Sequence, residues 1–342
     1  MPIKLFSALP FPKNGLYCIV VHSLQEELIA MKRYLPYLAG IGVALTWGFS
    51  FMFTRGALDY LSPFHLLGLR FAAAVTAMAL LRMLGIIRIN VTPKDYLSLL
   101  PLAFFQPILY FSSETIGVLL TSASYAGMMI AIIPIFVAIL SVFFLREYPN
   151  RLQVLFITAS VSGVIFIIYM DTQSITGINP LGTLALLGAV AAAAGFNIAS
   201  RKASVNHPPL QTTWVMMVFG AVIFNGVALT QHLLAGNLET YLGTLTELWM
   251  TIIYLGVVSS VAAFFMYNYV LSKITATQGS VFANMVTVVA IAAGVTFRGE
   301  TVFWYQLVGT AAILAGVWGT NRFAPAPPQE YHEPESAAES LT

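Results

Sequence analysis

Long apolar stretches separated by short polar segments run along the chain from about residue 34 to residue 321. Stretches of about 20 apolar residues are typical of transmembrane helices, because each helical residue advances about 1.5 Å through a hydrocarbon core about 30 Å thick. A transmembrane β-barrel would instead show alternating strands of about ten residues. The pattern predicts ten transmembrane helices, near residues 34–54, 62–84, 96–117, 122–145, 152–170, 180–200, 210–233, 248–271, 277–297 and 303–321.

The two halves of the chain repeat identical residues at a fixed spacing. Six pairs are 153 residues apart: Ala123/Ala276, Phe144/Phe297, Glu147/Glu300, Gln153/Gln306, Ala159/Ala312 and Gly163/Gly316. Gly48-Phe49 and Gly195-Phe196 repeat at a spacing of 147, so a short loop insertion separates the two registers. A five-span unit begins and ends on opposite sides of the membrane, and its copy therefore inserts upside down. The sequence predicts an all-α membrane protein with ten transmembrane helices as two inverted five-helix repeats, an arrangement typical of secondary transporters.

The distribution of basic residues tests the span count independently. With a cytoplasmic N-terminus, eleven Lys and Arg residues fall on the inner side, and only Arg55 and Arg298 fall on the outer side. Cytoplasmic loops carry an excess of Lys and Arg, so this bias supports ten spans with both termini in the cytoplasm. The inner residues are Lys32, Arg33, Arg82, Arg88, Lys94, Arg146, Arg151, Arg201, Lys202, Lys273 and Arg322.

Composition and missing motifs exclude several classes of protein. Charged residues make up 9% of the chain, against about 25% in soluble proteins. The single cysteine, Cys18, excludes an intrachain disulfide framework and a cysteine-rich metal site, and a net charge of +2 carries no nucleic-acid signature. Neither a G-x-x-x-x-G-K-[ST] phosphate loop nor an H-E-x-x-H pair occurs. We expect no enzyme, no cofactor and no metal, with a small-molecule substrate and the lipid bilayer as partners and the oligomeric state open.

The two ends of the chain differ in composition from the central part. Residues 1–33 form an N-terminal extension, in which the apolar run 16–21 is too short to span a membrane and Met31 would make a natural start. Two interpretations of residues 1–30 stay open, a misassigned start or an extension without fixed structure. Residues 322–342 are rich in Pro, Glu and Ser, which predicts a disordered cytoplasmic tail.

Several motifs resemble those of the EamA family of drug/metabolite transporters. Residues 44–50, Ala-Leu-Thr-Trp-Gly-Phe-Ser, are similar to its A-x-x-W-G-x-[NS] signature, and residues 69–71 are similar to its L-R-F motif. Residues 121–147 carry the T-x-A-S, Pro and L-x-E elements of its fourth helix. The resemblance divides the chain into EamA-like repeats at 34–173 and 178–321. It implies a ten-helix carrier in the cell (plasma or inner) membrane, with both termini cytoplasmic, that moves small organic metabolites, often outward.

Two ionisable residues lie deep within predicted spans. A charged side chain is energetically costly at that depth, so each is a candidate for a functional role. Arg70 and Glu114 fall at similar depths in the outer half of the membrane, where an ion pair between them is geometrically feasible, and Trp47 falls at a comparable depth. We hypothesise that Arg70 holds a substrate carboxylate, that Trp47 forms an apolar or cation–π wall, and that Glu114 binds substrate and exchanges a coupling proton. The alternative is that Arg70 and Glu114 neutralise each other or snorkel to the interface, with Trp47 as packing.

The second half offers neutral polar residues at related depths. Tyr267 stands 153 residues after Glu114, so the two copies have diverged in charge. We expect Tyr267, Asn268 and Asn284 to contribute neutral hydrogen bonds to the substrate site. The alternative is that the asparagines tie helices together.

Three further residues are candidates for conformational roles. Pro134 falls mid-span, where its missing N–H and its ring kink a helix, so it is a candidate hinge. The equivalent position in the second half is Thr287. Glu147 and Glu300 end equivalent spans on opposite faces, as interface anchors or as matched gate partners.

The sequence favours a secondary transporter that works by alternating access, with protons as a candidate coupling ion. One buried Arg and one buried Glu match the two charges of a zwitterion, so export of amino acids or similar zwitterions is the first expectation. The aromatic-rich spans favour an alternative, an exporter of hydrophobic or cationic drug-like compounds. A channel would need a ring of charges or a repeated filter. A non-transporting membrane scaffold or sensor, the alternative of a different class, would normally carry a substantial soluble domain.

Overall fold

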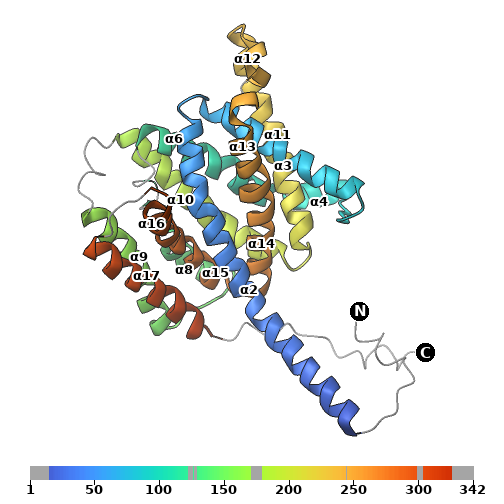
Figure 1. The fold of residues 1–342 in the computed structure, drawn as a ribbon, viewed down its shortest axis with the longest axis vertical. Helices are drawn as coiled ribbons and strands as arrows, with labels where there is room; N and C mark the ends of the chain where they lie inside the picture. The colour runs from blue at the N-terminus through green and yellow to red at the C-terminus, as the bar shows by residue number, and fades with distance from the viewer. Residues whose placement is uncertain are drawn as a thin grey trace.

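The computed structural model describes residues 15–121, 126, 129–170, 179–243, 245–298 and 303–325, of which residues 15–33 and some shorter stretches are described in backbone only. All regular elements in these ranges are helical (Figure 1). Six helices there are long and apolar enough to cross a membrane: Tyr34–Ala57, Pro63–Met83, Leu100–Leu120, Pro180–Ala203, Pro209–Leu234 and Leu248–Lys273. The all-α class is confirmed, whereas the count of ten spans and the inverted orientation of the halves stay predictions.

The helices of the first half end near the predicted polar boundaries, but α8 covers only the later part of the predicted span 122–145, whose residues 122–125 and 127–128 lie outside the described residues. They are α2 (Gly15–Ala57), α3 (Pro63–Met83), α4 (Pro93–Ser98), α5 (Leu100–Ala103), η1 (Phe104–Leu109), α6 (Tyr110–Leu120), α8 (Ile133–Phe144) and α9 (Arg151–Met170). Helix α2 continues through residue 33, where the sequence placed the end of an extension. Residues 1–14, most of the predicted tail and Glu300 lie outside the described residues.

The second half has a corresponding series of helices. They are α10 (Pro180–Ala203), α11 (Pro209–Leu234), α12 (Leu238–Gly243), α13 (Leu245–Ile253), η3 (Tyr254–Ala262), α14 (Ala263–Lys273), α15 (Ala276–Ser280), η4 (Val281–Asn284), α16 (Met285–Arg298) and α17 (Trp304–Arg322). Helices α3, α10 and α11 each have a proline in their first turn, where the missing N–H costs no hydrogen bond. Gly85 and Gly236, with φ of 72° and 67°, follow the ends of α3 and α11 and supply the left-handed conformation that terminates a helix.

Irregular helical segments occur at related positions of the two halves. The π-helical segment η1 corresponds, 153 residues on, to residues 257–262 of η3. A turn at Ala131 and Ile132 precedes α8, and η4 precedes α16 at the related place. Pro134 is therefore the second residue of α8, beside an interruption, and does not bend a continuous helix. Because of these interruptions, helices α8 and α16 are shorter than the predicted spans 122–145 and 277–297.

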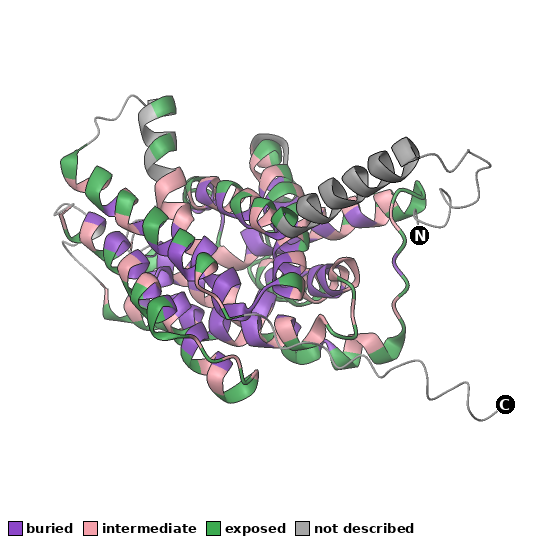
Figure 2. Ribbon diagram, turned by 90° about the horizontal axis from the view of Figure 1, so that it is seen from below, coloured by how far each residue is buried: buried purple, intermediate pink, exposed green. Residues whose placement is uncertain are grey.

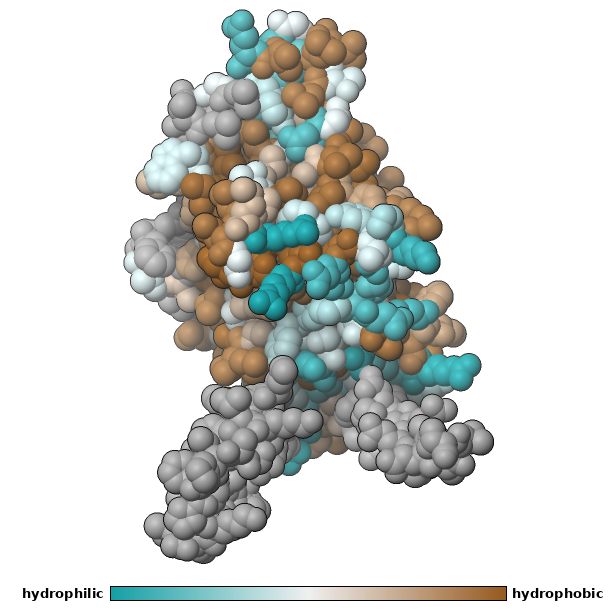
Figure 3. Space-filling model, turned by 90° about the vertical axis from the view of Figure 1, so that its right-hand side faces the viewer, coloured by the Kyte–Doolittle hydropathy of each residue, from teal (hydrophilic) through white to brown (hydrophobic). Residues whose placement is uncertain are grey.

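Helix packing follows the same relation between the halves. Helix α2 packs against α14 and α16, as α10 packs against α6 and α8. Helix α3 packs against α11, and α9 packs against α17 at one side of the bundle (Figure 1). Exchanging the two halves maps the contacts of α2 onto those of α10, and maps the α3–α11 and α9–α17 contacts onto themselves. Buried residues concentrate where the helices meet (Figure 2), and apolar side chains cover much of the face in Figure 3, mainly above its middle.

The contact between α9 and α17 depends on small residues. A Cβ atom added to Gly316 would lie 2.6 Å from the Phe156 carbonyl oxygen and 2.5 Å from Ser160 Cβ. A Cβ on Gly309 or on Gly163 would lie 2.7 Å from the carbonyl oxygen of the other glycine. Glycine at such contacts lets two backbones approach closely.

We expect Gly316→Ala to lower the melting temperature of the purified protein, because overpacking a tight contact costs about 1–3 kcal/mol. Gly226→Ala is the matched control, since a Cβ at Gly226 of α11 meets nothing within 4 Å. Thermal unfolding in detergent, followed by light scattering and tryptophan fluorescence, measures both variants. Equal melting temperatures would show that the α9–α17 contact yields to an added methyl group.

Candidate functional site

A pocket lies among helices of both halves. The space between its lining residues, counted together with the solvent-open part, is about 650 Å³. Helices α2, α3, η1, α6 and α8 line it from the first half, and α10, α14, η4 and α16 line it from the second. The pocket is thus a shared surface of the two halves.

Much of the lining consists of positions that are related by the repeat. Ser50 and Asn197 are 147 residues apart, and four further pairs are 153 residues apart: Phe111/Phe264, Glu114/Tyr267, Ile130/Ala283 and Ile133/Val286. Equivalent positions of the two halves therefore meet at this pocket.

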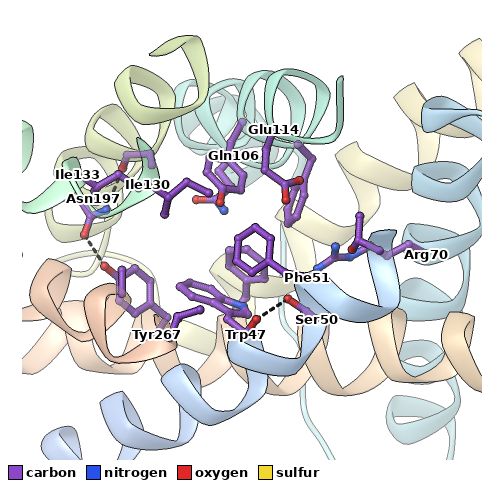
Figure 4. Close-up of a pocket in the computed structure, with 17 residues that line it drawn as sticks. Trp47, Ser50, Phe51, Arg70, Gln106, Glu114, Ile130, Ile133, Asn197 and Tyr267 are labelled. Carbon is purple, nitrogen blue, oxygen red and sulfur yellow. Dashed lines mark hydrogen bonds between the residues drawn. The ribbon is translucent and has the colours of Figure 1, made fainter. Parts of the chain in front are cut away.

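Four of the six predicted substrate-site residues line this pocket (Figure 4). In the figure, Glu114 points into the space from one side, Trp47 faces it from α2, Arg70 enters from α3, and Tyr267 closes the far end. Counting residues along the predicted spans had placed these side chains at similar depths in the membrane. The fold arranges them around one pocket.

Asn268 and Asn284 lie outside the lining of the pocket. Asn268 is buried and accepts a hydrogen bond from Ser200 Oγ at 2.7 Å, while its Nδ2 donates to Thr213 Oγ1 at 3.0 Å. Asn284 Nδ2 donates to Ser160 Oγ at 3.1 Å. Both side chains join neighbouring helices, which is the alternative that the sequence left open.

Arg70 is held by contacts that the sequence did not reveal. Its Nε donates to Ser260 Oγ at 2.8 Å and its Nη2 to Ser259 Oγ at 3.1 Å, and its guanidinium carbon lies 4.4 Å from the ring centroid of Phe111. Only 4% of Arg70 is exposed. No carboxylate of the described residues lies within 4.0 Å of it, so the direct Arg70–Glu114 ion pair considered from the sequence is not formed.

The π-helical turns of η3 place these serines. Ser260 Oγ donates to the Leu255 carbonyl five residues earlier at 2.8 Å, and the Ser259 carbonyl accepts from Trp47 Nε1 at 3.3 Å. A π-helical segment inside an α-helix leaves backbone groups free for other partners and is frequent at functional sites. In this protein, one π-helical turn of the second half accepts the Trp47 hydrogen bond and carries both serines that bind Arg70.

The equivalent turn of the first half contributes Gln106, which sequence reasoning missed. Gln106 stands 153 residues before Ser259 and has non-helical angles, φ −151° and ψ 117°, within η1. This break directs a buried amide into the pocket beside Glu114 (Figure 4). The Gln106-Pro107 pair within an apolar stretch was the available signal, since proline removes a helical hydrogen bond.

The Glu114 carboxylate has few partners. Its Oε2 accepts from Thr115 Oγ1 at 3.2 Å, and 5% of the residue is exposed. Within the described part of the chain, no Lys, Arg or His nitrogen lies within 4.0 Å of it. A buried carboxylate with a single neutral hydrogen bond is poorly compensated.

Aromatic rings form the wall opposite Glu114. The ring centroid of Trp47 lies 5.4 Å from that of Phe264 and 5.2 Å from that of Tyr267, both within the range of favourable ring contacts. Tyr267 Oη donates to Asn197 Oδ1 at 2.7 Å. The second half thus supplies Phe264 and the neutral pair Tyr267–Asn197 to the lining. The first half supplies Trp47 and the Glu114 carboxylate.

A second polar cluster lies one helical turn beyond Asn197 and Tyr267. Arg201 Nε donates to Glu147 Oε1 at 3.0 Å, and Arg201 Nη1 donates to the Leu271 carbonyl at 3.1 Å. The backbone N–H of Ala276 donates to Glu147 Oε2 at 3.0 Å. We call Glu147, Arg201, Leu271 and Ala276 the ion-pair latch, because they tie the segment after α8 to α10, α14 and α15 on the side predicted to be cytoplasmic.

Comparisons with known proteins agree with the fold. The family model of the EamA-like transporter family matches residues 35–169 and 180–322. The uncharacterized transporter YcxC of Bacillus subtilis is 35% identical over 287 residues, which cover 83% of this chain and 92% of that protein. A probable amino-acid metabolite efflux pump of Salmonella typhimurium is 25% identical over 81% of this chain and 91% of its own length.

A solved crystal structure shares the fold at low sequence identity. It aligns with a TM-score of 0.64 over 84% of this chain and 97% of its own, at 16% identity. The matched segments of the family model cover most of the present sequence and include the motifs of residues 44–50 and 69–71. The chain therefore belongs to the EamA-like transporter family.

Proposed function

We propose that this protein is a secondary transporter of small organic metabolites that works by alternating access, with the central pocket as the transport site. The observation that carries the proposal is the lining of the pocket by repeat-related pairs. Inverted repeats that meet at a central site let a carrier open to either side, because each half adopts in turn the conformation of the other. The same polar groups then face both sides of the membrane in succession.

Two substrate classes have support from specific observations. Amino acids or similar zwitterions are supported by Glu114 and Arg70 in one pocket, and by the 25% identical relative named a probable amino-acid metabolite efflux pump. Hydrophobic or cationic drug-like compounds are supported by the rings of Trp47, Phe264 and Tyr267. Export is the direction we favour, and Glu114 is our candidate for proton coupling.

Counterflow in proteoliposomes tests the carrier function. The purified protein is reconstituted with a concentrated unlabelled solute inside, and labelled amino acids, nucleosides and organic amines are offered outside, with and without a pH gradient. We expect at least one solute to accumulate transiently above protein-free liposomes, because a carrier exchanges substrate across its alternating site. Counterflow of no solute in the panel would contradict the proposal, and flux that is indifferent to the pH gradient would remove proton coupling alone.

A further inference from the structure

The two charged residues of the pocket differ in how far their binding capacity is already used. The Nε and Nη2 atoms of Arg70 form one edge of the guanidinium, which can bind a carboxylate with two parallel hydrogen bonds. Ser260 and Ser259 occupy that edge, and the Phe111 ring lies against the guanidinium carbon. Two of the five N–H donors of Arg70 thus link α3 to η3, while Phe111 of α6 lies against its guanidinium carbon.

Glu114 has the opposite character. Its carboxylate is buried, lines the pocket and receives a hydrogen bond from Thr115, with no cation of the described residues within 4.0 Å. A buried carboxylate is stabilised when a cation pairs with it, and it is costly without one. Arg70 lines the same pocket but makes no direct ion pair with Glu114, so a substrate cation is free to pair with the carboxylate.

The walls of the pocket define the rest of such a substrate. Trp47, Phe111, Phe264 and Tyr267 line the space with rings. Aromatic faces attract cations and also pack against apolar groups. A ring-lined space with one available carboxylate is suited to an organic amine with an apolar body.

We propose that the transport site recognises the cationic nitrogen of an apolar amine at Glu114, and that a substrate carboxylate is dispensable. This inference rests on the proposed carrier function, and it narrows the substrate class. Amino acids with apolar side chains and simple organic amines then share one subsite, with the ammonium at Glu114 and the apolar body among the rings. N-acylated amino acids, which keep the carboxylate and lose the cation, are excluded.

Binding to the full-length purified protein tests the inference with four related probes. Phenylalanine carries both charges, 2-phenylethylamine and phenylalanine methyl ester carry only the cation, and N-acetylphenylalanine carries only the carboxylate. Isothermal titration in detergent measures each affinity. We expect the two cation-only probes to bind within about threefold of phenylalanine, and N-acetylphenylalanine to bind at least tenfold more weakly. Binding of N-acetylphenylalanine as tight as that of 2-phenylethylamine would overturn the inference, as would failure of 2-phenylethylamine to bind.

Variants assign the subsite to Glu114. Glu114→Gln keeps the size of the side chain and removes its charge, so we expect at least a tenfold loss of affinity for 2-phenylethylamine. Glu239→Gln is the matched control, because Glu239 is an exposed acid on α12, outside the pocket. Unchanged affinity in Glu114→Gln would overturn the assignment. The probe series on the unaltered protein decides the substrate class even if that variant folds poorly, and counterflow of the solute panel tests the carrier function separately.

Discussion

Arg70→Lys is expected to reduce counterflow at least tenfold while the protein still reaches the membrane. A lysine ammonium is a compact charge that cannot reproduce the planar edge bonded to Ser259 and Ser260, nor the flat contact with Phe111. Hydrogen bonds to charged groups are worth roughly 1.5–3 kcal/mol each, so losing one of the two is sufficient for a tenfold effect. Arg70→Lys keeps the positive charge, so this variant tests the geometry of the Arg70 contacts.

The matched control lies on the same helix. Arg82→Lys changes the same side chain at an exposed position of the last turn of α3, and we expect it to transport normally. The double variant Ser259→Ala/Ser260→Ala removes the partners of Arg70 and should lose as much activity as Arg70→Lys. Combining all three changes should add little, because the groups act as one unit. Full activity of Arg70→Lys would show that the serine contacts do not position the pocket.

Sequence patterns predicted helix positions and depth better than they predicted side-chain direction. The predicted spans 62–84, 180–200 and 210–233 correspond to α3, α10 and α11, because prolines and polar turns mark where apolar helices start and end. Depth along a helix follows from counting residues, and it brought Trp47 and Glu114 to one level. Consecutive helical residues point about 100° apart, so Tyr267 lines the pocket and Asn268 faces α10 and α11.

The hydropathy pattern could not reveal the π-helical turns. A π-helical turn and a regular α-helical turn can have the same apolar composition, so hydropathy along the chain does not distinguish η1 and η3 from regular helix. The partners of Arg70 are likewise invisible, because Ser259 and Ser260 lie on the other half of the chain. The repeat relates the two irregular turns, since Gln106 and Ser259 are equivalent positions and both lie in π-helical segments.

The two halves differ in charge at the ion-pair latch, as they do in the pocket. Arg201 corresponds, at the spacing of 147, to Thr54, which lines the pocket and has no charge. An ion pair therefore joins the helices on the predicted cytoplasmic side, and the first half has a neutral residue at the position related to its arginine. In the proposed alternating-access cycle we expect the latch to separate when the pocket opens to the predicted cytoplasmic side, so that the strength of the pair influences how often that state forms.

Arg201→Gln is accordingly expected to make the pocket more accessible from the predicted cytoplasmic side. The Glu147 and Arg201 side chains are 8% and 20% exposed, and removing one partner of a largely buried pair costs roughly 3–5 kcal/mol. Much of that cost is relieved when the latch opens and water solvates Glu147. We therefore expect at least a fivefold gain in the rate of labelling of a cysteine at Ser50 in a Cys18→Ser background.

Labelling with a membrane-impermeant maleimide in inside-out vesicles measures this rate, and intact cells give the rate from the other face. Lys202→Gln is the matched control, because Lys202 is the exposed neighbour of Arg201 on α10 and lies outside the latch. Glu147→Gln should act like Arg201→Gln, since the amide keeps an acceptor for the Ala276 N–H and loses the ion pair. Labelling rates equal to those of Lys202→Gln would show that the pair anchors the helices without gating the pocket.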